Sequence, residues 1–359
     1  MIKPTKAQLL ISGCILFALS SSSFANDIEI ERLKKRLSAL ESQQANHSKQ
    51  ASDKSSGKFY GTLRPSLTQF DQGDSNKTDV TDFLSHAGFY FEHELTNGWT
   101  AIGHGEWSID IANNGDFGKS RRAYVGVDSP YGRVAIGKQR PVQYLLIAEY
   151  VDIFNHANAP FAYDNYSPFF VNNMVSYKKS WQNVSLLASA QFNGFESSDD
   201  ADMVNVGLTY DHNDLHIAAA YLTQDFADDN NADLVGSTAD TVAVSLANRF
   251  DNGFYIAAAW QERDLDVVAG LDSEQTTVDV SMAYPLSKEY TAKFGYFHLD
   301  NDMPEAVNNS HHGFNITLEH HLSDNFQIHG EVLRKAFDYD EDSTAISIGL
   351  KYNFSIKWQ

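Results

Sequence analysis

The chain has 359 residues, a formal net charge of −20 at pH 7 and one cysteine, Cys14. Removing a predicted leader, which contains Lys3 and Lys6, leaves a net charge of −22. Such an acidic chain is a poor partner for nucleic acid, because neutralising phosphates requires clustered Lys and Arg. Without Cys14 the mature chain has no thiol, which excludes disulfides, cysteine-bound zinc and thiol catalysis. Beyond the leader no run of 18 apolar residues occurs, which excludes membrane-spanning helices.

Residues 1–25 have the pattern of a secretory signal peptide. Two lysines precede an apolar stretch at 9–19, and Ser23-Phe24-Ala25 is a small-x-small cleavage site, so we expect cleavage after Ala25. The alternative is a lipoprotein box at 11–14 with a lipidated Cys14. The very short apolar segment before Cys14 favours the signal peptide.

Residues 26–44 predict a short periplasmic coiled coil. Ile30, Leu33, Leu37 and Leu40 repeat with spacing 3, 4, 3, as the a and d positions of heptads do. A lone surface helix packed on a core is the alternative, but the chain has no other helical pattern for it to pack against. Two heptads are too short to be stable alone, so another interface must hold the partners together. Residues 45–58 are polar and predict a flexible linker.

From Phe59 to Phe354 the apolar residues alternate with period 2. In the last segment, Ile346, Ile348 and Leu350 share one face with Tyr352 and Phe354. Sixteen such segments of about ten residues fit strands that cross a bilayer. They lie at 58–70, 82–95, 98–111, 119–128, 132–140, 170–179, 182–193, 202–211, 214–224, 238–250, 253–263, 274–284, 289–300, 312–322, 325–337 and 343–354.

The connections alternate between tight turns and longer, mostly acidic loops such as 225–240 and 338–342. Seven tight turns, rich in Asn, Asp, Gly and Pro, lie at 96–98, 129–132, 180–181, 212–214, 251–253, 285–288 and 323–325. Aromatic residues gather beside them, as at a membrane interface. A soluble β core is the weaker alternative, because the aromatics cluster at strand ends. The sequence predicts an all-β, 16-stranded antiparallel transmembrane barrel with both ends on the short-turn side, preceded by the coiled coil.

Segments 85–101, 119–139, 169–179 and 346–354 resemble the Gram-negative general porin family of trimeric outer-membrane channels. The resemblance implies a homotrimer in the outer membrane of a Gram-negative bacterium, with periplasmic termini. It implies contacts with outer-membrane lipids, lipopolysaccharide and the barrel-assembly machinery, for which Tyr352 and Phe354 would be the C-terminal signature. The barrel would then span 59–354 and be followed by an unpaired tail, 355–359. The implied function is passive diffusion of small hydrophilic solutes, without enzymatic activity or cofactor.

The resemblance also implies that the third long loop, 141–168, folds inward and that its acids face a basic wall. The predicted constriction combines wall residues Arg64, His86, Glu106, Lys119 and Arg121 with loop acids Glu149, Asp152 and Asp164. Three departures from the family pattern stand out. His86 replaces an arginine, Phe170 and Val171 stand where another would be, and the loop lacks a Pro-Glu-Phe-Gly turn. With the acidic loops, these changes predict a weak to moderate cation preference.

Other function classes have less support. An adhesin or binding surface formed by the long acidic loops remains the main alternative. No nucleophile is flanked by partners for hydrolysis, and no calcium-loop motif occurs. The histidine pairs 311–312 and 320–321 would point to opposite faces of a strand, so neither pair can ligate one ion. We therefore predict no catalytic residue, no metal site and no cofactor.

Overall fold

The computed structural model describes residues 36, 38, 55–113, 115–156, 167–192, 203–226, 237–266, 272–305 and 308–358. The chain divides into two compact units, Met1–Lys54 and Ser55–Gln359. In the first, Arg36 and Ser38 are helical and exposed. The predicted signal peptide, the four coiled-coil positions, linker residues 45–54 and Asp164 lie outside the described residues. Among the described residues, no helix is both long and apolar enough to cross a membrane.

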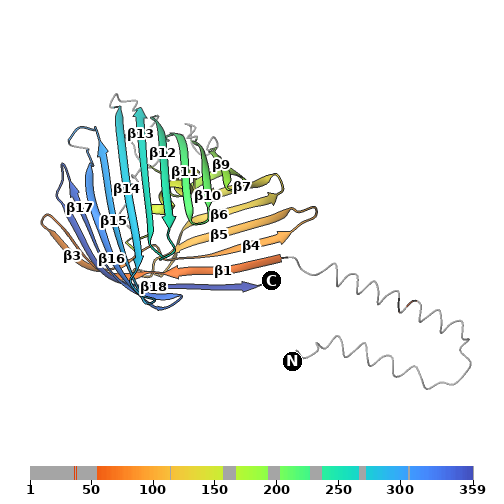
Figure 1. Cartoon of the computed structure of the whole chain (residues 1–359), viewed down its shortest axis with the longest axis horizontal. Coiled ribbons are helices and arrows are strands. Elements are labelled where there is room, and N and C mark those ends of the chain that lie inside the picture. The colour runs from red at the N-terminus through yellow and green to blue at the C-terminus, as the bar shows by residue number, and fades with distance from the viewer. Residues whose placement is uncertain are drawn as a thin grey trace, which may run out of the picture. The chain divides into compact units, whose positions relative to one another are not determined.

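The second unit is one antiparallel sheet that closes on itself (Figure 1). From β4 onward each strand pairs with its neighbour in sequence, and β18 pairs with β1 and β2 to close the barrel. The strands are β1 (Ser55–Leu63), β2 (Pro65–Gln72), β3 (Ser75–Asp82), β4 (His86–Glu94), β5 (Thr100–Ile109), β6 (Phe117–Ser129), β7 (Gly132–Gln139), β8 (Val171–Trp181), β9 (Val184–Gln191), β10 (Met203–His212), β11 (Leu215–Asp225), β12 (Thr238–Arg249), β13 (Tyr255–Asp266), β14 (Ser273–Pro285), β15 (Tyr290–Asn301), β16 (His311–Ser323), β17 (Phe326–Phe337) and β18 (Ser343–Trp358).

Two of the barrel strands are bent, which explains eighteen labels for sixteen strands. β1 and β2 are halves of one strand interrupted at Arg64, and β3 and β4 are halves of the next, interrupted at 83–85. β18 spans both halves of the first, pairing with β2 through 343–349 and with β1 through 352–358. The predicted sixteen-stranded antiparallel barrel is therefore confirmed.

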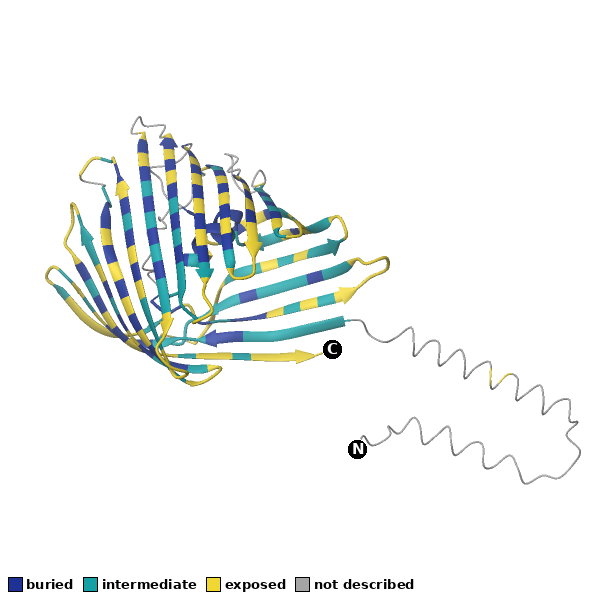
Figure 2. Ribbon diagram, in the orientation of Figure 1, coloured by how far each residue is buried: buried dark blue, intermediate teal, exposed yellow. Residues whose placement is uncertain are grey.

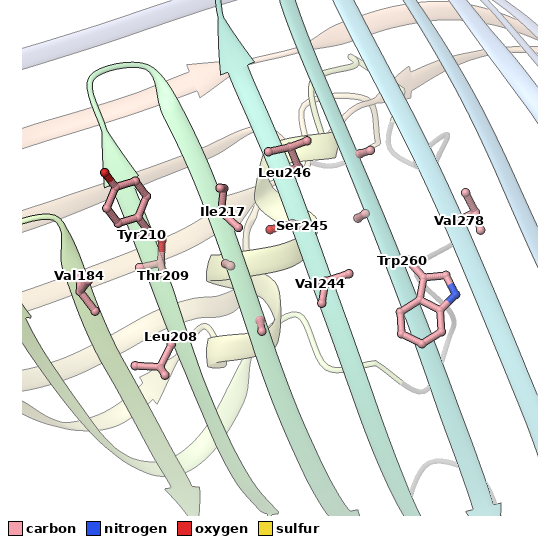
Figure 3. A pocket seen from close by; sticks show the side chains of 14 residues that line it. Val184, Leu208, Thr209, Tyr210, Ile217, Val244, Ser245, Leu246, Trp260 and Val278 are labelled. Carbon is pink, nitrogen blue, oxygen red and sulfur yellow. The ribbon is translucent and has the colours of Figure 1, made fainter.

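Side chains alternate between the two faces of the wall as the period-2 pattern predicts, and Figure 2 shows the resulting stripes. On β18, Ile346 and Ile348 are 50% and 65% exposed, whereas Ala345 and Ser347 are buried. The outer face is apolar over β10–β14. There Leu208, Val244, Leu246 and Trp260 surround a shallow hollow of about 690 Å³ on the side away from the interior (Figure 3). Such a surface suits contact with lipid chains.

The seven predicted tight turns all join consecutive strands, and several depend on positive φ. Asn97, Asn213 and Gly253 have φ of 61°, 52° and 81°, which Asn and Gly tolerate better than other residues. One predicted long connection is wrong. Residues 71–81 form a hairpin in which β2 and β3 are joined at Gly73 and Asp74. Most of β3 is exposed and polar, so it carries no alternation by which the sequence could have revealed it.

Both ends of the barrel extend further than predicted. Residues 55–58, assigned to the linker, belong to β1, and residues 355–358, assigned to an unpaired tail, belong to β18. The two extensions pair with each other, from Gly57 opposite Trp358 to Tyr60 opposite Ser355. The Trp358 ring packs over Gly57, where a Cβ would lie 2.6 Å from Cζ2. The sequence pattern did not predict this pairing, because the first residues of β1 are polar and include a glycine, so they show no apolar alternation.

Deleting residues 355–359 should therefore weaken the closed barrel. The deletion removes four paired positions opposite β1, and each cross-strand pair contributes roughly 0.2–1 kcal/mol. The temperature at which the folded form loses its fast mobility in SDS gels should fall relative to the full chain. Deleting Gln359 alone is the control, and equal temperatures for the two deletions would show that the extension adds no stability.

Candidate pore constriction

The inner loop, defined here as residues 141–156, contains a π-helical turn η1 (Tyr144–Ala148) and the short helix α3 (Glu149–Val151). Figure 3 shows these turns behind the sheet, opposite the outward apolar side chains. Five wall side chains, each from a different strand, lie within hydrogen-bond distance of a loop carbonyl. They are His216 (β11, 3.0 Å) and Ser245 (β12, 2.6 Å) at Leu146 O, Tyr255 (β13, 2.6 Å) at Tyr150 O, Ser281 (β14, 2.7 Å) at Val151 O, and Lys293 (β15, 2.6 Å) at Ile153 O. The loop therefore runs across the interior along successive strands.

Small residues on the inner wall make room for the loop. Inward alanines of β11, β12 and β13 form a buried cluster with the apolar loop residues, namely Ala218, Ala220, Ala243, Ala247, Ala257 and Ala259 with Val142, Tyr144, Leu146, Ile147, Ala148 and Val151. At Gly207 a Cβ would lie 2.6 Å from Leu146 Cδ1, and at Gly295 it would lie 2.5 Å from Phe154 Cζ. Close packing of this kind fixes the loop position, because either larger side chains or voids would cost stability.

Two buried carboxylates hold the far end of the loop. The Glu331 oxygens accept the backbone N–H groups of Asn155 and His156 at 3.1 and 2.8 Å. Glu319 Oε1 accepts the Asn155 amide at 2.9 Å and Lys293 Nζ at 2.7 Å. Burying a carboxylate is costly unless it is hydrogen-bonded or paired, and both conditions are met here. These glutamates anchor the loop against β16 and β17.

The acids of the inner loop face basic side chains of the wall. Asp152 interacts electrostatically with Arg64, Arg140 and Lys351, and Tyr144 donates a hydrogen bond to its Oδ2 at 2.9 Å. Burial raises the pKa of Asp152, and the Tyr144 hydrogen bond partly offsets this effect. Burial likewise raises the pKa of Glu149, which is partly offset by the nearby charge of Arg140. A transverse arrangement of opposite charges therefore spans this part of the lumen.

Most of the predicted wall residues come together. Glu106 is 3% exposed, accepts Arg121 Nε at 2.8 Å and the Tyr60 hydroxyl at 2.7 Å, and lies 3.9 Å from His86. Arg64 reaches the loop itself, with Nη2 at 3.0 Å from Asn155 O. Lys119 is exposed and has Lys138 as its charged neighbour, so it does not join this group.

A bulge in β6 separates Lys119 from the arginines and brings in Arg122, which strict alternation would place on the other face. The register shifts so that Glu106 opposes Arg122 and Trp107 opposes Ser120, which leaves Arg121 as the extra residue. A bulge breaks strict alternation, so Arg121 and Arg122 both interact with Glu106. The two adjacent arginines in the segment KSRR (119–122) were the sequence signal that could have indicated this residue.

The other missed residues are Arg140, Lys293, Lys351, Glu319 and Glu331. Arg140 lies between the end of β7 and the inner loop, and the other four project inward from β15 to β18. Their strands are distant in sequence from the loop, so only closure of the barrel brings them to it. The alanine-rich segments HIAAAY (216–221) and YIAAAW (255–260) were a usable signal for the part of the wall that the loop covers.

The family described as Gram-negative porin matches residues 15–342. The chain belongs to this family. Its members are non-enzymatic, passive channels of the outer membrane. A search of curated proteins found no match to this porin.

Solved structures support the same fold. OmpTΔL8 of Vibrio cholerae aligns with a TM-score of 0.69 at 16% identity, covering 84% of this porin and 100% of that chain. An anion-selective porin from Comamonas acidovorans aligns with a TM-score of 0.68 at 15% identity, covering 84% and 100%. Salmonella typhi OmpF in complex with daunomycin aligns with a TM-score of 0.65 at 17% identity, covering 83% and 97%. In this porin, among the described residues, no three His, Cys, Asp or Glu side chains are grouped to hold a metal.

Proposed function

We propose that this porin is a passive diffusion channel for small hydrophilic solutes and ions, with both termini in the periplasm. The proposal is supported by the position of the inner loop inside a closed barrel, where its acids Glu149 and Asp152 face basic side chains. Charged groups at the narrowest point of a water-filled barrel decide which solutes pass. Lipids, lipopolysaccharide and the assembly machinery are the proposed partners of its outer face.

Liposome swelling tests this proposal against the alternative of an adhesin. Liposomes that contain the purified protein should swell in isosmotic pentose or hexose faster than empty liposomes, with rates that fall as the sugar grows. An adhesin would bind through its long acidic loops without admitting sugar. Swelling no faster than in empty liposomes would reject the channel and favour the binding surface.

We further propose a weak preference for cations. In the described part of the constriction six basic side chains face five carboxylates, so the local formal charge is close to neutral. They are Arg64, Arg121, Arg122, Arg140, Lys293 and Lys351 against Glu106, Glu149, Asp152, Glu319 and Glu331. The charge of −22 on the mature chain, concentrated in the long loops, then raises the cation concentration at the mouth.

Glu149→Gln and Asp152→Asn should each reduce the cation-to-anion permeability ratio roughly threefold, since a unit charge about 7 Å away in water is worth about 0.6 kcal/mol. The ratio follows from the reversal potential in a salt gradient across a planar bilayer. Lowering the pH should have the same effect. Because burial raises the pKa of both groups, the loss should begin at a higher pH than for ordinary carboxyls. An anion preference at neutral pH and low salt, or ratios unmoved by both variants, would contradict this prediction.

We also propose a homotrimer assisted by the N-terminal coiled coil. One of the similar structures is a trimeric form of OmpT from Vibrio cholerae. Short helices tethered near a common axis gain from a high effective concentration. Leu33→Asp combined with Leu37→Asp should slow trimer assembly without abolishing it, as measured by the trimer fraction over time in cross-linking. Glu31→Lys, on the predicted polar face, is the control, and equal assembly rates in all three proteins would remove this role.

A further inference from the structure

A cavity of about 370 Å³ lies between the inner loop and the wall formed by β6 to β10. Its volume falls within the range of small-molecule sites. The wall contributes Tyr124 and Leu187, the loop contributes Leu145 and Glu149, and Arg140 lies between the end of β7 and the loop. The cavity therefore combines aromatic and aliphatic surfaces with charges of both signs.

Two of these charged groups have no hydrogen-bond or ion-pair partner among the described residues. The Arg140 guanidinium stacks between two rings, with Cζ 3.6 Å from the centroid of Tyr144 and 4.3 Å from that of Phe170. Within the described part of the chain it makes no hydrogen bond or ion pair, and its Nε and Nη1 are buried without an acceptor. Glu149 likewise accepts no hydrogen bond from described residues. The two charges interact, yet they lie beyond the 4.0 Å of an ion pair.

The other charged groups around the cavity either have an ion-pair partner or are exposed to solvent. Arg133 donates to Asp128 Oδ2 through Nε at 3.0 Å and Nη2 at 2.5 Å. Asp211 Oδ1 lies 2.7 Å from His216 Nδ1. Lys178 is exposed. Arg140 and Glu149 are thus an unmatched cation and anion held apart, an arrangement whose desolvation is not offset by a direct pair.

We propose that this cavity is a subsite for small zwitterions of the α-amino-acid type, with the solute carboxylate on Arg140 and its ammonium group on Glu149. The proposal rests on the proposed channel function and specifies a solute class for it. Nη2 is the Arg140 nitrogen that the protein does not enclose, and it can donate a charge-assisted hydrogen bond to a carboxylate oxygen. Tyr124, Leu145 and Leu187 offer apolar contact, so aromatic and aliphatic amino acids should bind better than polar ones.

The test combines a binding measurement with a conductance measurement on the purified full-length protein. Phenylalanine is titrated into the detergent-solubilised protein and binding is followed by saturation-transfer NMR. Ion-current block is recorded in planar bilayers. Phenylpropionate and phenylethylamine are the matched solutes, since each lacks one of the two charges. Phenylalanine should bind at least about tenfold more tightly than either, because each analogue loses one hydrogen bond to a charged group.

Variants assign each charge to its partner. Glu149→Gln should weaken phenylalanine binding about tenfold and leave phenylpropionate unchanged, whereas Arg140→Gln should weaken phenylalanine and leave phenylethylamine unchanged. Glu341→Gln, which removes an exposed carboxylate from the 338–342 connection, is the control and should change nothing. If Arg140→Gln does not fold, the binding of the three solutes to Glu149→Gln still tests the subsite.

The outcomes separate the subsite from the channel. A protein that conducts salt but binds phenylalanine no better than either analogue overturns the subsite and leaves the channel standing. A protein that prefers phenylalanine and loses this preference in Glu149→Gln, yet conducts no salt, supports the subsite and overturns the channel. If Glu149→Gln weakened the binding of all three solutes equally, the substitution would have distorted the loop in general. This result would reject the assignment of the ammonium group to Glu149.

Discussion

Gly295→Val should displace the inner loop and widen the pore. Gly295 lies on the inner face of β15 opposite Phe154, and a Cβ at this position would be 2.5 Å from Phe154 Cζ. Phe154 is 4% exposed and its carbonyl is held by Arg64, so the ring has little room to move. Overpacking of this kind costs about 1–3 kcal/mol, which should raise the population of displaced loop by one to two orders of magnitude. Single-channel recordings should show a higher, noisier conductance, and trisaccharide uptake should rise.

Gly330→Val is the matched control for this substitution. Gly330 lies on the outer face of β17, and nothing is within 4 Å of an added Cβ. The control should therefore keep the original conductance. If Gly295→Val also kept it, with trisaccharide uptake unchanged, the packing of Phe154 against β15 would not be what holds the loop in the lumen.

Glu106→Gln should move selectivity toward anions more strongly than any change in the loop acids. The Glu106 carboxylate is buried, accepts Arg121 Nε at 2.8 Å and interacts electrostatically with Arg122. Removing its charge leaves two guanidinium groups uncompensated inside the lumen, where screening is weaker than at the mouth. The cation-to-anion permeability ratio should fall by more than the roughly threefold effect of a single unit charge with water between, because two guanidinium groups lose their shared carboxylate. Reversal potentials in a salt gradient measure the ratio.

Glu92→Gln provides the comparison for this variant. Glu92 lies on β4 and accepts the Tyr90 hydroxyl at 2.9 Å, away from the two guanidinium groups. Removing its charge should change the ratio much less. Equal shifts in the two variants would mean that only the total charge of the pore matters, and that the contact between Glu106 and Arg121 has no separate effect.

The repeating parts of the fold could be predicted from the sequence, because alternation is a local property. Side chains on a strand point to opposite faces, so Ile346 and Ala345 reveal their environments without any knowledge of neighbours. Tight turns are local as well, since Asn97, Asn213 and Gly253 adopt positive φ. The errors arose where the pattern is weak. The polar β3 and the extension of β18 to Trp358 are strands because a neighbouring strand pairs with them.

The strand number, the tight turns and the acids of the inner loop could be predicted from the sequence alone, because each depends on a short stretch of residues. The basic side chains that meet those acids are set by the three-dimensional arrangement of the strands. Closure of the barrel brings Lys293 and Lys351 from the C-terminal strands to a loop near residue 150. The bulge in β6 turns Arg122 inward beside Arg121, while Lys119 stays outside the group. These contacts depend on register and closure, which join residues far apart in the chain and leave no periodic trace in it.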